Sequence, residues 1–204
     1  MTAVQCTNAP MGRGTTMAIA LPRHRFTVDE YHRLAEVGLL SEDDRVELID
    51  GEIIEMPPIG DNHSGHVNRF TRVFSRVFGD RALLHIQNPV RLGRYREPEP
   101  DVVLLRPRDD DYDSSKPVPD DVLLLVEVAD SSLEYDRDTK AQLYAEAGII
   151  EYWLVNLVDG VMMVYRDPHP EGYRSVQLVR HTDRIRLLSF PDIEFAVSEV
   201  LRPR

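Results

Sequence analysis

The sequence predicts an α/β domain whose core runs helix, three antiparallel strands, second helix and parallel strand. Apolar residues recur at helical spacing from Asn62 to Phe78. Three runs of strand character follow, separated by proline-containing and charged loops that suit an antiparallel meander. A further apolar run, EYWLVNLV, comes after a second helical segment. A strand, helix, strand connection of this kind predicts parallel pairing with both faces of the sheet covered.

The first elements of the chain are predicted by capping and turn residues. Residues 1–22 are small and polar without periodicity, and we expect them to be a disordered leader. Thr27 is a typical N-cap for a short helix from Val28 to Glu36, which Gly38 ends. The stretch RVELIDGEIIEM alternates around an Asp-Gly pair, which predicts a hairpin.

The remaining elements follow from apolar runs and their breaks. After EYWLVNLV, an Asp-Gly turn and the run VMMVYR predict a hairpin, and LLSFPDIEFAVSEVL predicts a short strand and a final helical turn. The core strands are predicted at Leu83–Leu92, Asp101–Arg106 and Val122–Val128, and the second helix at Arg137–Ala147.

Composition limits the function classes. The 204 residues, 42% of them hydrophobic, suit a single domain over residues 23–204. No apolar run is long enough for a membrane span or a signal peptide, so we expect a cytoplasmic protein. The only cysteine, Cys6, excludes an internal disulfide framework and a cysteine-based zinc cluster.

The net charge of −11 argues against a nucleic-acid partner, but the charge is unevenly distributed. Arg69, Arg72 and Arg76 recur at helical spacing and form a candidate nucleic-acid-binding face. An ordinary solvated surface is the alternative interpretation of these arginines.

Glu127 is the most informative single residue. Six of the seven residues from Val122 to Val128 are apolar, and Glu127 is the exception. A buried carboxylate must be protonated, paired with a cation or bound to a metal. Asp101 begins the preceding strand, and antiparallel pairing brings it to the same sheet edge. Lys140, in the opening turns of the next helix, can lean back over both acids.

Two carboxylates and an ammonium suit metal-dependent phosphodiester hydrolysis. Carboxylate oxygens suit Mg²⁺ or Mn²⁺, which take one or two protein carboxylates and keep several waters. The lysine could orient or deprotonate the attacking water, or stabilise the charge of the pentavalent phosphate. The sequence therefore predicts Asp101 and Glu127 as metal ligands and Lys140 as a catalytic residue.

Several motifs resemble the Uma-two family of the PD-(D/E)XK nuclease superfamily over roughly residues 26–200. They are VELIDGEIIEMPPIGDNH, EPEPDVVLL, LLLVEVADSS and YDRDTKAQLYAEAGIIEYWLV. The resemblance implies a restriction-endonuclease-like core, with an N-terminal helix and hairpin and a C-terminal β extension.

The resemblance also implies roles for individual residues. Pro100 and Asp101 match the Pro-Asp pair of the second core strand, and Glu127 matches the acid of the third. The lysine usual two residues later is replaced by Ala129, which implies that Lys140 has taken its place. Glu47 in the hairpin and His63 at the first core helix also fall in motifs of the family, and either could complete the site.

Structural roles remain alternatives for each of these residues. Asp101 could end a loop by accepting backbone hydrogen bonds, and Glu127 and Lys140 could form only a structural ion pair. Glu47 could be an exposed hairpin acid, and His63 could cap its helix. Asp136 and Lys140 could form a surface pair, while Tyr144, Tyr152 and Trp153 are expected to pack in the core.

The leading hypothesis is a Mg²⁺- or Mn²⁺-dependent endonuclease acting on DNA. Because cutting a duplex generally needs two sites, a homodimer is a plausible assembly. A catalytically weak or silent member that binds nucleic acid or protein is the alternative, since Ala129 stands where the lysine is usual. A third hypothesis is a hydrolase of a smaller phosphorylated substrate.

Overall fold

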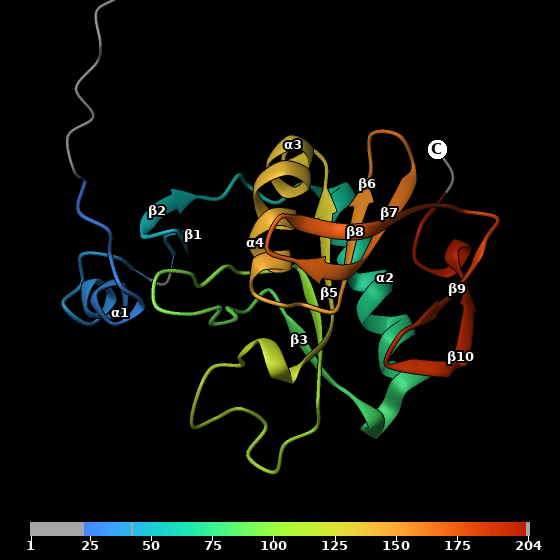
Figure 1. Cartoon of the computed structure of the whole chain (residues 1–204), viewed down its shortest axis with the longest axis horizontal. Helices are drawn as coiled ribbons and strands as arrows, with labels where there is room; N and C mark the ends of the chain where they lie inside the picture. The colour runs from blue at the N-terminus through green and yellow to red at the C-terminus, as the bar shows by residue number, and fades with distance from the viewer. Residues whose placement is uncertain (1–22, 42, 203–204) are drawn as a thin grey trace, which may run out of the picture.

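The computed structural model describes residues 23–41 and 43–202, so the expected leader lies outside the described residues. Its centre is a mixed sheet with the strand order β3-β4-β5-β6-β7-β8. Figure 1 shows helix α2 on one face of this sheet and the α3–α4 segment on the other. The strands are β3 (Leu83–Ile86), β4 (Val102–Leu105), β5 (Val122–Ala129), β6 (Glu151–Asn156), β7 (Val161–His169) and β8 (Gly172–Arg180).

The pairing of these strands confirms the predicted core. β3, β4 and β5 form an antiparallel meander, and β5 pairs in parallel with β6. The crossover between β5 and β6 contains α3 (Leu133–Tyr135), the π-helix η3 (Asp136–Lys140) and α4 (Ala141–Glu146). Helix α2 (Asp61–Phe78) precedes the meander, as its apolar spacing predicted.

Two small antiparallel sheets flank the centre. Strands β1 (Val46–Ile49) and β2 (Glu52–Glu55) form the expected hairpin, next to helix α1 (Val28–Glu36). Strands β9 (Arg184–Leu187) and β10 (Phe190–Ala196) lie beside α2 at the opposite end of the molecule (Figure 1). β10 and the turn after it match the predicted C-terminal extension.

Three details differ from the sequence predictions. The strand predicted over Leu83–Leu92 stops at Ile86, because Gln87 has a positive φ of 48° and Pro89 has no N–H to donate. The helix predicted from Arg137 begins at Leu133 and contains a π turn. Strands β8 and β9 were not predicted, since β8 is a largely exposed edge strand without strict hydrophobic alternation.

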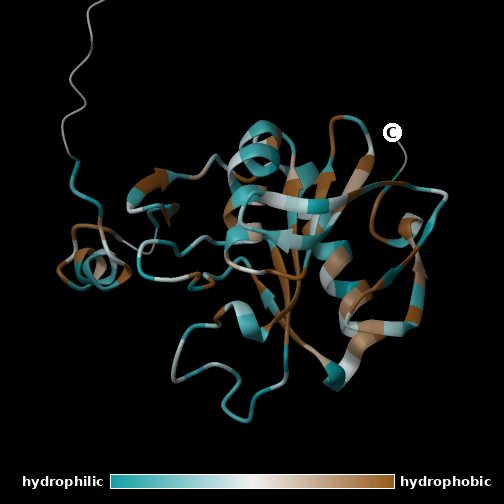
Figure 2. Cartoon of the chain, in the orientation of Figure 1, coloured by the Kyte–Doolittle hydropathy of each residue, from teal (hydrophilic) through white to brown (hydrophobic). Residues whose placement is uncertain are grey.

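The sheet separates two apolar clusters. Phe74 of α2 packs against Phe70 and Trp153 on one face, while Tyr144 of α4 packs against Tyr152 on the other. Trp153 and Tyr152 are fully buried, as predicted. Figure 2 shows hydrophobic colouring concentrated in the central strands.

Among the residues that the structure describes, no helix combines the length and the apolar character that crossing a membrane requires.

Candidate active site

The register of β4 and β5 brings the two predicted metal ligands together. Val102 pairs with Val126, so the next positions along the two strands are Asp101 and Glu127. Opposite positions of an antiparallel pair project to the same face. Both side chains are buried, yet both line the same cleft. The predicted proximity of the two carboxylates is therefore what the structure shows.

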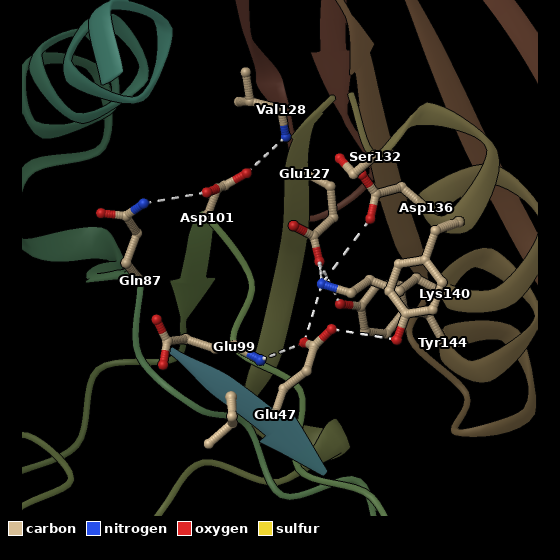
Figure 3. Close-up of polar contacts among 12 residues, drawn as sticks. Glu47, Gln87, Glu99, Asp101, Glu127, Val128, Ser132, Asp136, Lys140 and Tyr144 are labelled. Carbon is tan, nitrogen blue, oxygen red and sulfur yellow. Dashed lines mark hydrogen bonds and ion pairs between the residues drawn. The ribbon is translucent and has the colours of Figure 1, made fainter. Parts of the chain in front are cut away.

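Lys140 reaches this pair from the crossover. Its Nζ lies 3.0 Å from Oε1 of Glu127 and 3.1 Å from Oε2 of Glu47. Asp136, four residues earlier, has its Oδ1 4.0 Å from the same nitrogen. The π-helix η3 carries both residues toward the sheet, and single π turns of this kind are frequent at functional sites. Figure 3 shows the ammonium surrounded by the three carboxylates.

Glu47 comes to the site from the hairpin. Its Oε2 accepts a hydrogen bond from the backbone N–H of Glu99 at 3.2 Å, and its Oε1 accepts one from the hydroxyl of Tyr135 at 3.3 Å. Glu47 is only 2% exposed, so it is a buried site residue and not an exposed hairpin acid. Gly51 shapes the turn before β2: its φ is +82°, and an added Cβ would lie 2.6 Å from Cβ of Arg25.

Three donors hold the carboxylate of Asp101. The backbone N–H of Val128 donates to Oδ2 at 2.8 Å, and Nε2 of His63 lies 3.0 Å from the same oxygen. The side-chain amide of Gln87 donates to Oδ1 at 3.3 Å. His63 therefore orients Asp101 from the first turn of α2, in contrast to the helix cap considered from the sequence.

The hydroxyl of Tyr144 donates to Oε1 of Glu127 at 2.6 Å, so this tyrosine belongs to the site as well as to the core. Oε1 of Glu127 thus accepts from both Tyr144 and Lys140, and Figure 3 shows its other oxygen facing the space beside Asp101.

Burial and mutual repulsion shift the titration of this cluster. Burial raises the pKa of Glu127 well above its ordinary value, against the attraction of Lys140. Burial also raises the pKa of Asp136. Burial alone would lower the pKa of Lys140, but Glu127, Glu47 and Asp136 raise it well above its ordinary value. Lys140 is therefore an ammonium whose charge attracts all three neighbouring carboxyl groups.

The cluster forms one wall of a cleft of about 560 Å³. The β2–α2 loop, with Pro57, Pro58 and Gly60, and the loop after β5, with Asp130 and Ser131, also line it. Glu99 lines the cleft too, and burial raises the pKa of its carboxyl group. The acids are therefore accessible to a ligand although each is largely covered.

The donor set fits a divalent ion that takes few protein ligands. Within the described ranges, no group of three or more His, Cys, Asp or Glu side chains is arranged to enclose a metal. Asp101 and Glu127 instead offer two carboxylates on an open cleft, which leaves coordination positions to water and substrate. Mg²⁺ is commonly bound in this way, through one or two carboxylates and substrate phosphates.

The three predicted DNA-binding arginines lie on α2 outside the lining of the cleft. Arg72 is exposed, and Arg69 is half-buried. Arg76 is in contact with Glu199, which compensates its charge. These positions leave the DNA-binding role of the three arginines a prediction.

Some residues of the site were not found from the sequence. Gln87 and Glu99 were not singled out, and Tyr135 and Asp136 were not assigned to the site. The Glu-Pro-Glu-Pro-Asp run could have indicated Glu99. A residue before proline favours extended backbone, and Glu99 lies two residues before Asp101 in this run. Gln87 carries no such signal, since its contact depends on where β3 ends.

Comparison with known proteins identifies the family. A family model named Uma2, described as "Putative restriction endonuclease", matches residues 28–198. A solved structure of "a putative nuclease belonging to DUF820" from Anabaena variabilis ATCC 29413 has the same fold, with a TM-score of 0.67 at 16% identity. The match covers 86% of this chain and 97% of that one. No curated protein matches the chain in sequence. The chain therefore belongs to the Uma2 family of restriction-endonuclease-like proteins.

Proposed function

We propose that the chain is a Mg²⁺- or Mn²⁺-dependent endodeoxyribonuclease. The observation that carries this proposal is the convergence of Asp101, Glu127 and Lys140 on one open cleft. A carboxylate pair beside an ammonium provides ligands for a divalent ion and a positive charge for a phosphate. Membership of a family described as "Putative restriction endonuclease" supports a nucleic acid as the substrate.

Each residue of the site has a role that follows from its contacts. Asp101 and Glu127 would hold the ion, which when bound supplies Lewis-acid polarisation and lowers the pKa of water. His63 and the N–H of Val128 fix the orientation of Asp101. Lys140 lies next to Glu127 and would supply positive charge to the scissile phosphate or to the attacking water.

Lys140 also accounts for the missing lysine of the usual motif. Ala129 occupies that position in β5, and the crossover helix delivers Lys140 to Oε1 of Glu127. Glu47 and Asp136 share this ammonium, and they hold it in the site. We infer that Glu47 positions the lysine and leaves metal ligation to Asp101 and Glu127.

Plasmid cleavage with Mn²⁺ or Mg²⁺ tests the proposal. The changes Asp101→Asn and Glu127→Gln should each lower the rate by orders of magnitude, because each removes a charged metal ligand. Asp130→Asn is the matched control, since Asp130 is an exposed acid on the same cleft. An inactive wild type, or equal rates for all four proteins, would refute the proposal.

A catalytically silent, nucleic-acid-binding protein is the second candidate. The contacts of Glu127 favour it, because Lys140 and Tyr144 already satisfy one of its two carboxylate oxygens. In that case the wild type would bind DNA without cutting it, and Mn²⁺ would not raise its melting temperature. A metal-dependent increase in melting temperature that Glu127→Gln abolishes would instead support metal binding.

A further inference from the structure

The cleft beside Asp101 and Glu127 is strongly acidic, which is unfavourable for a strand of DNA. Of the described residues that line it, two are of the Lys or Arg type, Lys140 and Arg45. Lys140 already lies close to three carboxylates. The acids of the lining are Glu47, Glu55, Glu99, Asp101, Glu127, Asp130 and Asp136. A polyanionic substrate therefore needs a further positive charge in this cleft, besides the metal ion of the proposed function.

Arg45 is the cation of the cleft that is not paired with an acid. Within residues 23–41 and 43–202 it forms no ion pair, whereas Lys140 forms three. Arg45 is half-buried, and its Nη1 donates a hydrogen bond to the carbonyl oxygen of Pro57 at 2.8 Å. None of its nitrogen atoms is among the buried polar atoms that lack a partner. The N–H groups that Pro57 does not accept are therefore open to solvent and to a ligand.

The hairpin places Arg45 beside the acids that hold Lys140. Arg45 immediately precedes β1, and its carbonyl oxygen accepts a hydrogen bond from the N–H of Met56 at 2.8 Å, which extends the hairpin by one pair. Alternate residues of a strand project to the same face, about 6.8 Å apart along the strand. Arg45 and Glu47 are such a pair, and Glu47 lies 3.1 Å from Nζ of Lys140. Arg45 is therefore close to the position proposed for the scissile phosphate.

Two neighbours keep the guanidinium of Arg45 at the cleft. The carbonyl group of Pro57 belongs to the β2–α2 loop, which lines the cleft. The second neighbour is Glu99: burial raises the pKa of its carboxyl group and the attraction of Arg45 lowers it, but the two groups form no ion pair. Arg45 is therefore oriented by a neutral acceptor, and its charge remains available to an anion.

We propose that Arg45 positions the substrate by binding a phosphate of duplex DNA next to the scissile one. A guanidinium suits a phosphate because its planar fork can donate two parallel hydrogen bonds. Pro57 accepts from one nitrogen of the fork, and the remaining N–H groups are free for the phosphate. This inference rests on the proposed function for its substrate, and it names the residue that holds that substrate in an acidic cleft. The structural alternative is that Arg45 only braces the β2–α2 loop.

Binding of labelled duplex DNA in EDTA, measured by fluorescence anisotropy over a range of salt concentrations, tests the inference without cleavage. Arg45→Gln removes the charge but keeps a side-chain N–H that can donate to Pro57. It should weaken binding about tenfold and reduce the slope of log affinity against log salt by about 0.9, the value of one phosphate contact. Arg45→Lys keeps the charge and should retain most of the slope. Arg174→Gln, which removes an exposed arginine of β8 outside the lining of the cleft, is the matched control and should leave the slope unchanged.

Cleavage kinetics and melting temperatures separate substrate positioning from a structural brace. In Mn²⁺, Arg45→Gln should raise KM about tenfold and change kcat much less, because a phosphate next to the scissile one is bound in the ground state and in the transition state alike. A brace for the loop would instead lower the melting temperatures of Arg45→Gln and Arg45→Lys and leave the salt slope unchanged.

The outcomes separate this inference from the proposed function. An unchanged slope for Arg45→Gln, an equal loss of slope in Arg45→Lys or Arg174→Gln, or no DNA binding by the wild type would each overturn the phosphate contact. Cleavage of DNA by a protein whose slope does not depend on Arg45 leaves the nuclease intact and refutes only the role of Arg45. A slope that depends on Arg45 in a protein that never cuts DNA supports the contact and refutes the nuclease.

Discussion

Removing the charge of Glu127 should leave the metal-free protein about as stable as the wild type, whereas removing the charge of Lys140 should not. At an effective dielectric constant of about 20, a unit ion pair at the 3.0 Å observed between Lys140 and Glu127 attracts by about 5 kcal/mol. Burying a carboxylate costs several kcal/mol, so the two effects largely cancel. In Glu127→Gln the ammonium also keeps Glu47 at 3.1 Å, and the new amide can still accept from Tyr144.

We therefore expect Glu127→Gln to change the free energy of unfolding by no more than about 1 kcal/mol. Lys140→Met leaves three buried carboxylates without their shared cation and should cost about 3 to 5 kcal/mol. In the double variant, which combines Lys140→Met with Glu127→Gln, one of those carboxylates is replaced by a neutral amide. It should therefore be more stable than Lys140→Met alone, which gives a measurable coupling energy.

Urea unfolding in EDTA measures these differences from the midpoint and the slope. A loss in Glu127→Gln as large as that in Lys140→Met would show that the two residues form an isolated structural pair. The interpretation that Glu47, Glu127 and Asp136 share the charge of Lys140 would then be refuted. Equal stability of Lys140→Met and wild type would refute it too, because the carboxylates would then not need the lysine.

Two further predictions concern single contacts. Tyr144→Phe removes one donor from buried Glu127 and should cost about 1 to 2 kcal/mol in urea unfolding and slow cleavage; unchanged stability and rate would exclude Tyr144 from the site. Burial lowers the pKa of His85, so its contribution to stability is present above the unfolded pKa of about 6.5 and is lost as pH falls through the lower folded value. His85→Gln should therefore lose less stability than wild type between pH 7 and pH 5. An equal loss would contradict a lowered pKa of His85 in the folded protein.

The positions of the two acids of the candidate site could be predicted from the sequence, because strand patterns fix them. A single carboxylate in an apolar run identified Glu127, and the antiparallel meander placed Asp101 opposite it. Lys140 followed because the crossover helix begins just past the same sheet edge. These inferences need only local periodicity and strand direction, which a single sequence records well.

The supporting residues could not be predicted in the same way, because their contacts depend on tertiary packing. Glu47 lies in a two-stranded hairpin of alternating polar and apolar residues. Its side chain is buried only because the hairpin packs against the segments that contain Glu99 and Tyr135. The π turn at Asp136–Lys140 has no periodic signature. The same limit applies to β8, whose exposed side chains give no hydrophobic alternation.

The acids of the site depend on a single lysine for most of their charge compensation. Glu47, Glu127 and Asp136 share a single ammonium, and Asp101 relies on His63, Gln87 and a backbone N–H instead. The described cluster therefore carries more carboxylates than cations. A second positive charge beside Asp101 and Glu127 would lower the repulsion among them and favour their ionised forms. Divalent ions should thus stabilise the fold through Asp101 and Glu127, and Glu47→Gln should retain that stabilisation while Asp101→Asn should lose it.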